Sequence, residues 1–296
     1  MQIAITGATG FLGQHLIRTA VRRGHEVVAF SRNPKQIVAE CIEVRSFSLH
    51  EPPNFRACDA VVHLSGESIA GWWSQSKMNR IRDSRIQGTR RVVESIRAMP
   101  DPPEVLVCAS AVGYYGDCGE AEVTEASPPG RGFLAEVCRA WETEAMAAER
   151  EGVTRLVHTR FGMILGAGGG ALPPMARAFR FYTGGPLGSG QQWWSWIHVA
   201  DAASLLLFAV ENLDARGPLN ANAPWPVRNA EFTAQLALTV HRPAFLRIPS
   251  FALRLLLRDF ASVLLESTRA LPAAAQELGF PFRFPELAPA LRDLLA

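Results

Sequence analysis

Short, continuous runs of apolar residues alternate with longer amphipathic stretches over the first two thirds of the chain. Five runs rich in Val, Ile and Leu have the length of buried strands, at 2–5, 27–30, 60–64, 105–109 and 156–160. Between them, apolar residues recur at helical spacing in 14–23, 78–98 and 134–150, and Gly24 and Gly152 stand where helix ends are expected. This alternation predicts an α/β fold with a doubly wound parallel sheet covered by helices on both faces.

The pattern changes after about residue 162. Glycine-rich loops at 166–170 and 184–190 flank a helix-like stretch at 172–181, and 196–199 leads into an apolar helix that reaches about 212. The tail from about 248 holds several prolines and a leucine-rich helix. We therefore expect a small, mostly C-terminal lobe beside the sheet.

Composition and charge exclude several classes of protein. The 296 residues are 48% hydrophobic, which allows a large core, and the net charge of +2 comes without any block of like charge, so no nucleic-acid partner is expected. The five cysteines form no C-x-x-C pair, and no His/Asp/Glu cluster has metal-ligand spacing. We expect no disulfide framework, no metal, no membrane partner and a cytoplasmic location.

The strongest motif opens the chain. Gly7, Gly10 and Gly13 follow the first predicted strand and begin a helix, which is the context of a dinucleotide-binding turn. Gly7 allows the tight turn, Gly10 lets the backbone approach a pyrophosphate, and Gly13 lets the helix pack against the strand. The free N–H groups of the turn and of the helix start would hold the phosphates. The predicted cofactor contacts here are Gly7, Thr9, Gly10, Phe11, Leu12 and Gly13.

The end of the second predicted strand distinguishes between the two nicotinamide cofactors. Proteins that bind NAD place Asp or Glu there for the ribose 2′-hydroxyl. This chain has Ser31 and Arg32 instead, so no carboxylate repels a 2′-phosphate. The guanidinium of Arg32 offers a fork of donors suited to that phosphate, which favours NADP(H) over NAD(H). A solvated arginine at a strand end is the alternative.

With this motif the chain resembles the extended short-chain dehydrogenases/reductases, and within them an atypical epimerase-family branch of unknown substrate. The resemblance runs from residue 1 to the last residues, on segments 63–69, 81–85, 110–116, 133–142, 168–171, 184–190, 196–198 and 229–232. It implies a Rossmann domain over 1–240 with a lobe insertion at about 163–195, and a small C-terminal lobe at 241–296. It also implies further cofactor contacts at Leu64, Ser65, Arg85 and Arg160. An ordinary ion pair is the alternative for each arginine.

The catalytic pair of the superfamily is missing. Ordinary members use Tyr-x-x-x-Lys plus Ser, and in the matching segment those places hold Phe133 and Val137, or Leu134 and Cys138 in the other register. Neither register supplies a phenol or an ammonium, so the usual proton relay is absent. Ser110 and Tyr115 are the remaining catalytic candidates, and packing is the alternative for Tyr115.

Tryptophans and one histidine complete the candidate chemistry. Trp72 and Trp73 follow the segment at 66–69, and Trp193, Trp194 and Trp196 lie in the glycine-rich segment of the lobe. The resemblance places both groups near the nicotinamide, where they would favour an apolar or aromatic substrate, while lobe packing is the alternative. His198 begins a helix and is expected to be structural, with Asp201 as its candidate partner.

Two functions remain open at this stage. The first is an NADP(H)-dependent oxidoreductase, or an epimerase-like variant, that acts on a small carbonyl or alcohol substrate by an unusual proton route. The second is a catalytically inactive dinucleotide-binding regulator or scaffold with a protein partner, because relatives of this branch are linked by name to cell or plastid division. The missing Tyr-Lys pair favours the second, and the glycine motif with the tryptophans favours the first.

Overall fold

A twisted parallel sheet forms the centre of the computed structural model, which describes residues 1–33, 41–149 and 153–295. The strand order is β12-β7-β5-β4-β1-β2-β3, and every neighbouring pair in it is parallel. The strands are β1 (Gln2–Thr6), β2 (Glu26–Ser31), β3 (Glu43–Ser46), β4 (Ala60–His63), β5 (Val105–Ala111), β7 (Arg155–Phe161) and β12 (Gly217–Ala221). This arrangement confirms the predicted doubly wound fold.

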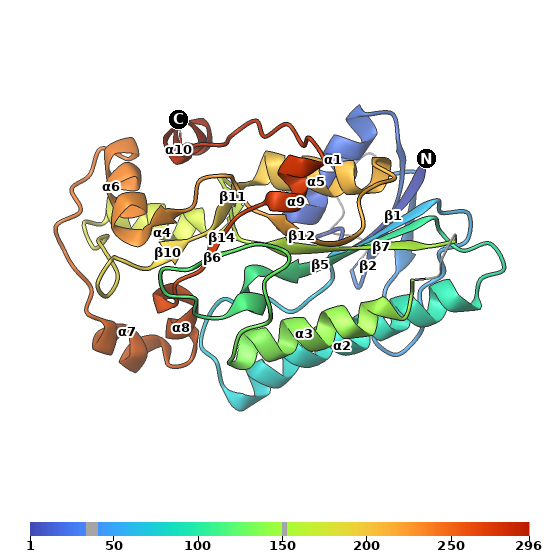
Figure 1. Cartoon of the computed structure of the whole chain (residues 1–296), viewed down its shortest axis with the longest axis horizontal. Coiled ribbons are helices and arrows are strands. Elements are labelled where there is room, and N and C mark those ends of the chain that lie inside the picture. Colours follow the sequence, from blue (N-terminus) through green and yellow to red (C-terminus); the bar gives the residue numbers. More distant parts are fainter. Residues whose placement is uncertain (34–40, 150–152, 296) are drawn as a thin grey trace.

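Helices cover both faces of the sheet (Figure 1). The long helices α2 (Gln75–Ala98) and α3 (Phe133–Met146) lie side by side on one face. On the other face α1 (Phe11–Arg22) packs against α5 (Val199–Glu211), and the short α9 (Ala273–Glu277) contacts β12. Strands covered on both faces need continuous apolar runs, which is why the sequence pattern identified the central ones.

The predicted elements match the observed ones closely at the centre of the sheet. The five predicted strands correspond to β1, β2, β4, β5 and β7, and the predicted helices to α1, α2 and α3 with starts one to three residues earlier. Gly24 follows α1 with a φ of 82°, as expected of a helix stop, whereas Gly152 lies outside the described residues. The apolar pattern did not predict β3 and β12, the two edge strands.

The lobe lies at one end of the sheet, beyond the carboxyl ends of its strands (Figure 1). Its helices are α4 (Leu172–Arg180), α6 (Asn229–Thr239), α7 (Ser250–Leu257), α8 (Phe260–Leu265) and α10 (Leu287–Leu295). Its short strands are β6 (Glu122–Val123), β8 (Met163–Gly166), β9 (Gly169–Gly170), β10 (Trp193–Trp194), β11 (Trp196–His198), β13 (Val227–Arg228) and β14 (Arg269–Ala270). Within the described ranges, no helix is long and apolar enough to cross a bilayer.

The apolar core of the lobe is assembled from three separate stretches of sequence. Leu172, Trp196, Phe232 and Leu291 belong to one buried cluster, whereas Ala275 and Phe280 belong to the core of the main sheet. The C-terminal segment therefore packs partly on the lobe and partly on the Rossmann domain. A division near residue 240 stays a prediction, and the packing ties both sides of it together.

Candidate functional site

The loops that follow the parallel strands meet at one edge of the sheet. From β1 the chain builds β2 and β3 outward on one side, and then returns to build β4, β5, β7 and β12 on the other. The crevice between β1 and β4 is thus the topological switch point, where ligands of such sheets bind. Loops 7–13, 64–74 and 112–116, which follow β1, β4 and β5, lie at this edge.

The glycine turn after β1 is closely packed against its neighbours. Gly7 has a φ of 70°, and a Cβ there would lie 2.8 Å from the carbonyl carbon of Leu64. A Cβ on Gly13 would lie 2.4 Å from the Gly7 carbonyl oxygen, so only glycine lets α1 start this close to the turn. No side chain within the described residues caps α1 at Gly10, and its first turn carries no acidic residue. The first-turn N–H groups therefore lack intrahelical acceptors, and with the helix dipole they form a cradle for a phosphate.

The side chain of Phe11 has a structural role, in addition to the backbone N–H group that Phe11 contributes to the cradle. Its ring fills the space above the β8–β9 hairpin, where a Cβ on Gly166 or Gly169 would lie 2.1 or 2.5 Å from ring atoms. The glycines of the predicted loop at 166–170 thus make room for Phe11. This contact fixes the start of α1 against the lobe insertion, while Leu12 packs against the main core.

The end of β2 reaches the glycine turn through hydroxyl groups. Ser31 is buried, its Oγ donates to Thr9 Oγ1 at 3.4 Å, and it accepts a hydrogen bond from the amide of Asn33 at 3.0 Å. Arg32 follows with an exposed side chain. The structure thus brings Thr9 and Ser31 together, and the next residue, Arg32, is exposed, which is compatible with the predicted 2′-phosphate contact.

The loop after β4 is held by Thr6 and Arg85. The Leu64 amide donates to both the carbonyl and the hydroxyl oxygen of Thr6, at 3.2 Å each, so it is already engaged by the protein. Arg85 donates to the carbonyls of Glu67 and Ile81, at 2.9 and 3.1 Å, and its guanidinium lies 5.1 Å from the Trp141 ring centroid. Burial lowers the pKa of Arg85. Arg85 therefore fastens this loop, and its predicted cofactor contact, like those of Leu64 and Ser65, stays a prediction.

A buried polar network lies under the same edge of the sheet. Arg160, at the end of β7, binds the Glu142 carboxylate with two hydrogen bonds of 2.8 Å, and their side chains are only 5% and 10% exposed. Ser110 donates to the same carboxylate at 2.6 Å. The Tyr115 hydroxyl accepts from Arg160 at 2.9 Å and donates to Asn220 Oδ1 at 2.8 Å. Each charge is therefore paired inside the protein.

This network engages the side chains predicted for a cofactor contact and for catalysis. Arg160 is committed to protein side chains, and its guanidinium also stacks 3.6 Å from the Tyr114 ring centroid, so holding Glu142 suits it better than a cofactor contact. Burial raises the pKa of Tyr115 to about 12, despite the nearby Arg160. Ser110 and Tyr115 both have partners, and neither lines the pocket described below. Their catalytic role stays a prediction.

Sequence reasoning missed Glu142, although a signal was present. Ala135, Cys138, Glu142 and Ala145 recur at helical spacing and all are buried on α3. A carboxylate in an otherwise apolar helix stripe requires a cationic partner, because an unpaired buried charge is costly. Asn220 gave no such signal, since the strand that carries it was not predicted.

The places of the missing Tyr-Lys pair hold side chains that pack. Phe133, the first residue of α3, meets the Trp73 ring edge-on with ring centroids 5.4 Å apart. Val137 is buried one turn later. In the alternative register, burial raises the pKa of the Cys138 thiol to about 11, so this thiol stays protonated near neutral pH. The segment forms a wall of the site and supplies no acid or base to it.

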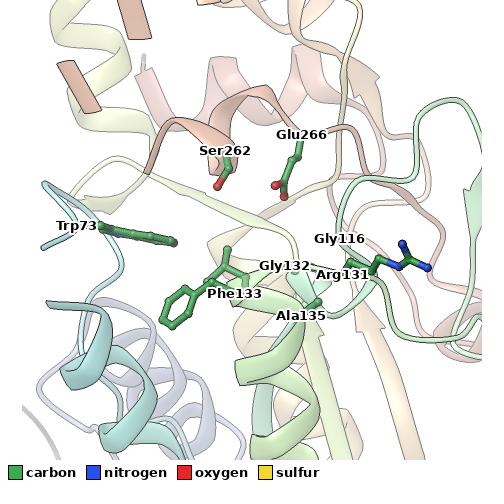
Figure 2. A pocket seen from close by; sticks show the side chains of 10 residues that line it. Trp73, Gly116, Arg131, Gly132, Phe133, Ala135, Ser262 and Glu266 are labelled. Atoms are coloured by element: carbon green, nitrogen blue, oxygen red, sulfur yellow. The ribbon is translucent and has the colours of Figure 1, made fainter. Parts of the chain in front are cut away.

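A pocket opens between the start of α3 and the lobe (Figure 2). Its walls come from the loop after β4, the loop after β5, the first turn of α3 and the end of α8. They include Trp73, Gly113, Gly116, Phe133, Leu134, Ser262 and Glu266. Sequence reasoning did not find Ser262 or Glu266, because the fold brings them here from more than a hundred residues away.

The remaining tryptophans mostly stabilise the lobe. Trp196 is fully buried, and Trp194 packs on Phe232 with ring centroids 5.3 Å apart. Trp193 stacks between two arginines, and Trp72 is exposed beneath Arg258. Of the two predicted groups, Trp73 alone lines the pocket, so lobe packing is the confirmed alternative for Trp194 and Trp196.

His198 is structural, as expected, but its predicted partner was wrong. Its Nδ1 caps α5 by accepting from the Ala200 amide at 3.1 Å, and its ring stacks on Phe284 at 3.9 Å between centroids. Burial lowers its pKa to about 4, and the carboxylate within 3.2 Å of its Nε2 belongs to Asp293. Asp201 instead accepts from the amides of Arg283 and Phe284, because the C-terminal segment crosses directly over the start of α5.

Comparison with known families supports this interpretation of the edge of the sheet. Residues 3–222 match the NAD dependent epimerase/dehydratase family. Residues 248–294 match a domain of unknown function, DUF1731, which contains the end of the pocket formed by α8.

Similar proteins match over the whole chain. The chain is 40% identical to the epimerase family protein SDR39U1 homolog, chloroplastic, from Arabidopsis thaliana, covering 100% of this chain and 87% of that protein. It is 39% identical to the epimerase family protein YfhF from Bacillus subtilis, covering 100% and 98%. The crystal structure of human epimerase family protein SDR39U1 with NADPH superposes with a TM-score of 0.92 at 34% identity, covering 100% and 99%.

Proposed function

Since the chain belongs to the NAD dependent epimerase/dehydratase family, we propose that it binds NADP(H) and transfers hydride between that cofactor and a small apolar or aromatic carbonyl or alcohol. The observation that carries the proposal is the uncapped start of α1 above the glycine turn, with Arg32 and no carboxylate at the end of β2. The NADPH bound by the human relative at 34% identity supports the same cofactor.

The residues of the edge have separate tasks in this proposal. The amides at the start of α1 bind the pyrophosphate, and Arg32 binds the 2′-phosphate. Adjacent strands lie about 4.8 Å apart, so the loop after β5, two strands from β1, is within reach of the far end of an extended dinucleotide. When bound, the cofactor supplies the hydride chemistry, and the protein orients the substrate.

The aromatic walls of the pocket favour an apolar substrate end. Trp73 is 3% exposed and its indole N–H donates to the Ile69 carbonyl at 2.6 Å, which fixes its ring against Phe133. Rigid aromatic walls exclude water from a substrate carbonyl and stack on planar groups. The aromatic walls therefore favour a flat, apolar carbonyl compound as the substrate.

The pocket wall also favours a second function. Phe133 and Val137 stand where a phenol and an ammonium are usual, which is the composition expected of a dinucleotide-binding regulator without catalysis. Such a protein would bind NADP(H) and change its affinity for a protein partner on doing so.

Consumption of NADPH separates the two functions. The purified protein is incubated with NADPH and a panel of aromatic and aliphatic aldehydes and ketones, and the loss of NADPH absorbance is followed. The oxidoreductase proposal predicts turnover, fastest with aromatic carbonyls and reduced by a Trp73→Ala substitution. NADPH binding without turnover across the panel would instead support the regulator.

A further inference from the structure

The pocket over the first turn of α3 contains one acidic side chain that the proposed function does not yet use. The pocket is small, with a cavity volume of about 20 Å³. A volume of this size holds about one water-sized group, so a substrate carbonyl oxygen can enter it while the rest of the substrate stays outside. Glu266 and Ser262 point into it from α8 and the residue that follows, opposite Phe133 (Figure 2).

The surroundings of Glu266 favour its neutral form. Burial raises its pKa, and the nearby Asp117 carboxylate raises it further. Asp117 is held in place by the amides of Ser267 and Gly119, which donate to its Oδ1 at 3.1 and 3.2 Å. Within the described part of the chain, no hydrogen bond or ion pair engages the Glu266 carboxyl group. It can therefore offer a proton to a group in the pocket.

Other charged or titratable groups around Glu266 do not offset this effect. Burial, with Asp117 and Glu266, raises the pKa of Cys118, so that thiol is neutral near pH 7. The side chain of Arg131 points away from the pocket (Figure 2). The walls supplied by Trp73, Leu134 and Gly113 are uncharged.

The alternative proton donors fit less well. The Tyr115 phenol is buried, and it already donates to Asn220. Ser110 donates to Glu142. Ser262 faces the pocket, but a hydroxyl without an adjacent base is a weak acid at neutral pH.

We propose that Glu266 is the proton donor of the site, in place of the missing tyrosine, to the carbonyl oxygen of a substrate whose reactive end lies over Phe133. The inference rests on the proposed oxidoreductase function. The substrate carbonyl carbon accepts a hydride from the reduced nicotinamide cofactor, and the carbonyl π electrons move to oxygen. That oxygen takes the carboxyl proton of Glu266. The products are the alcohol, the oxidised cofactor and the Glu266 carboxylate, which regains a proton from solvent.

Three forms of the full-length protein test this role, namely the native chain, Glu266→Gln and the matched control Glu277→Gln. Glu277 is exposed on α9, away from the pocket lining. Glutamine keeps a neutral hydrogen-bond donor in the pocket but cannot release a proton at any accessible pH. Carboxyl-labelled glutamate followed by NMR gives the titration of Glu266 directly, because its resonance is missing from the Glu266→Gln spectrum.

Binding of acetophenone gives a readout that is independent of turnover. Quenching of tryptophan fluorescence measures its affinity across the pH range in which Glu266 titrates. We expect the affinity of the native protein and of Glu277→Gln to fall about tenfold as the carboxyl ionises, since a donor becomes a repelling carboxylate. In Glu266→Gln the affinity should stay constant. An affinity that does not depend on pH in the native protein would overturn the proposal.

Turnover and cofactor binding then separate this inference from the proposed function. We expect Glu266→Gln to bind NADPH as the native protein does and to lose about a hundredfold in kcat, within the usual contribution of a general acid. Native turnover that survives in Glu266→Gln would refute the role of Glu266 and leave the oxidoreductase intact. Absence of NADPH binding or turnover in the native protein would refute the proposed function itself.

Discussion

The ion pair between Glu142 and Arg160 allows a quantitative test of how the interior under the carboxyl edge is stabilised. A Glu142→Gln substitution removes one of the two charges and keeps nearly the same volume. The new side-chain amide would direct its hydrogens at guanidinium hydrogens where the carboxylate now accepts two bonds of 2.8 Å. The Arg160 charge would remain 5% exposed without a counter-ion.

The expected magnitude follows from this burial. Removing one partner of a buried ion pair leaves an uncompensated charge and costs about 3–5 kcal/mol of unfolding free energy. The same helix carries a matched control, because Glu144 binds Arg90 with the same bidentate geometry at 2.9 and 3.0 Å, but with Arg90 52% exposed. A Glu144→Gln substitution should cost at most about 1 kcal/mol.

Urea unfolding followed by tryptophan fluorescence measures both variants against the native protein. The midpoint should fall for Glu142→Gln at an unchanged slope with denaturant. A double variant, Glu142→Leu with Arg160→Met, should be more stable than the sum of its single changes by roughly 1–3 kcal/mol, because it leaves no lone charge. Equal small losses for Glu142→Gln and Glu144→Gln would refute the account of this network.

Three further predictions concern the cofactor cradle and the core. Gly13→Ala should weaken NADPH binding at least about tenfold in a fluorescence titration, because its Cβ would lie 2.4 Å from the Gly7 carbonyl oxygen. The control Gly168→Ala, whose Cβ would enter open space, should leave NADPH binding unchanged. Arg32→Glu should lower NADPH affinity by about ten- to a hundredfold and change NADH affinity little, and equal losses would contradict the 2′-phosphate contact. Burial lowers the pKa of His63 to about 3. Unfolding lets it take up a proton below about pH 6.5, so this contribution to stability is complete above that pH and falls as the pH drops towards 3. His63→Gln should make the unfolding free energy fall less between about pH 6.5 and pH 3, as measured by urea unfolding at several pH values. The same dependence of unfolding free energy on pH in His63→Gln and the native protein would contradict this role of His63.

The sequence predicts the centre of the sheet because burial on both faces leaves a simple signature. β1, β2, β4 and β5 are nearly continuous apolar runs, whereas β7 is buried along its whole length but reads Arg-Leu-Val-His-Thr-Arg-Phe. The two edge strands, β3 and β12, lack such an apolar run. β3 is mostly exposed and contains Glu43 and Arg45, and β12 reads Gly-Pro-Leu-Asn-Ala. Edge strands tolerate charge, Pro and Gly, so neither resembles a buried run.

In the candidate site, too, local features could be predicted from the sequence and contacts between distant segments could not. The cradle is a local feature, because its three glycines lie within seven residues of chain, and the turn could be derived from their spacing. The partners of Arg160, His198 and Trp73 are set by tertiary contacts between distant segments. Glu266 reaches the pocket only because α8 folds back over the start of α3. Periodicity carries no information about such contacts.

Titration of the cofactor-stripped protein with NADPH and NADH, followed by fluorescence, tests the central claim most directly. The cradle at the start of α1 and the exposed Arg32 predict saturable binding of both, with NADPH bound more tightly by at least about tenfold. Binding of neither dinucleotide, or tighter binding of NADH, would contradict the assignment of this edge of the sheet as an NADP(H) site.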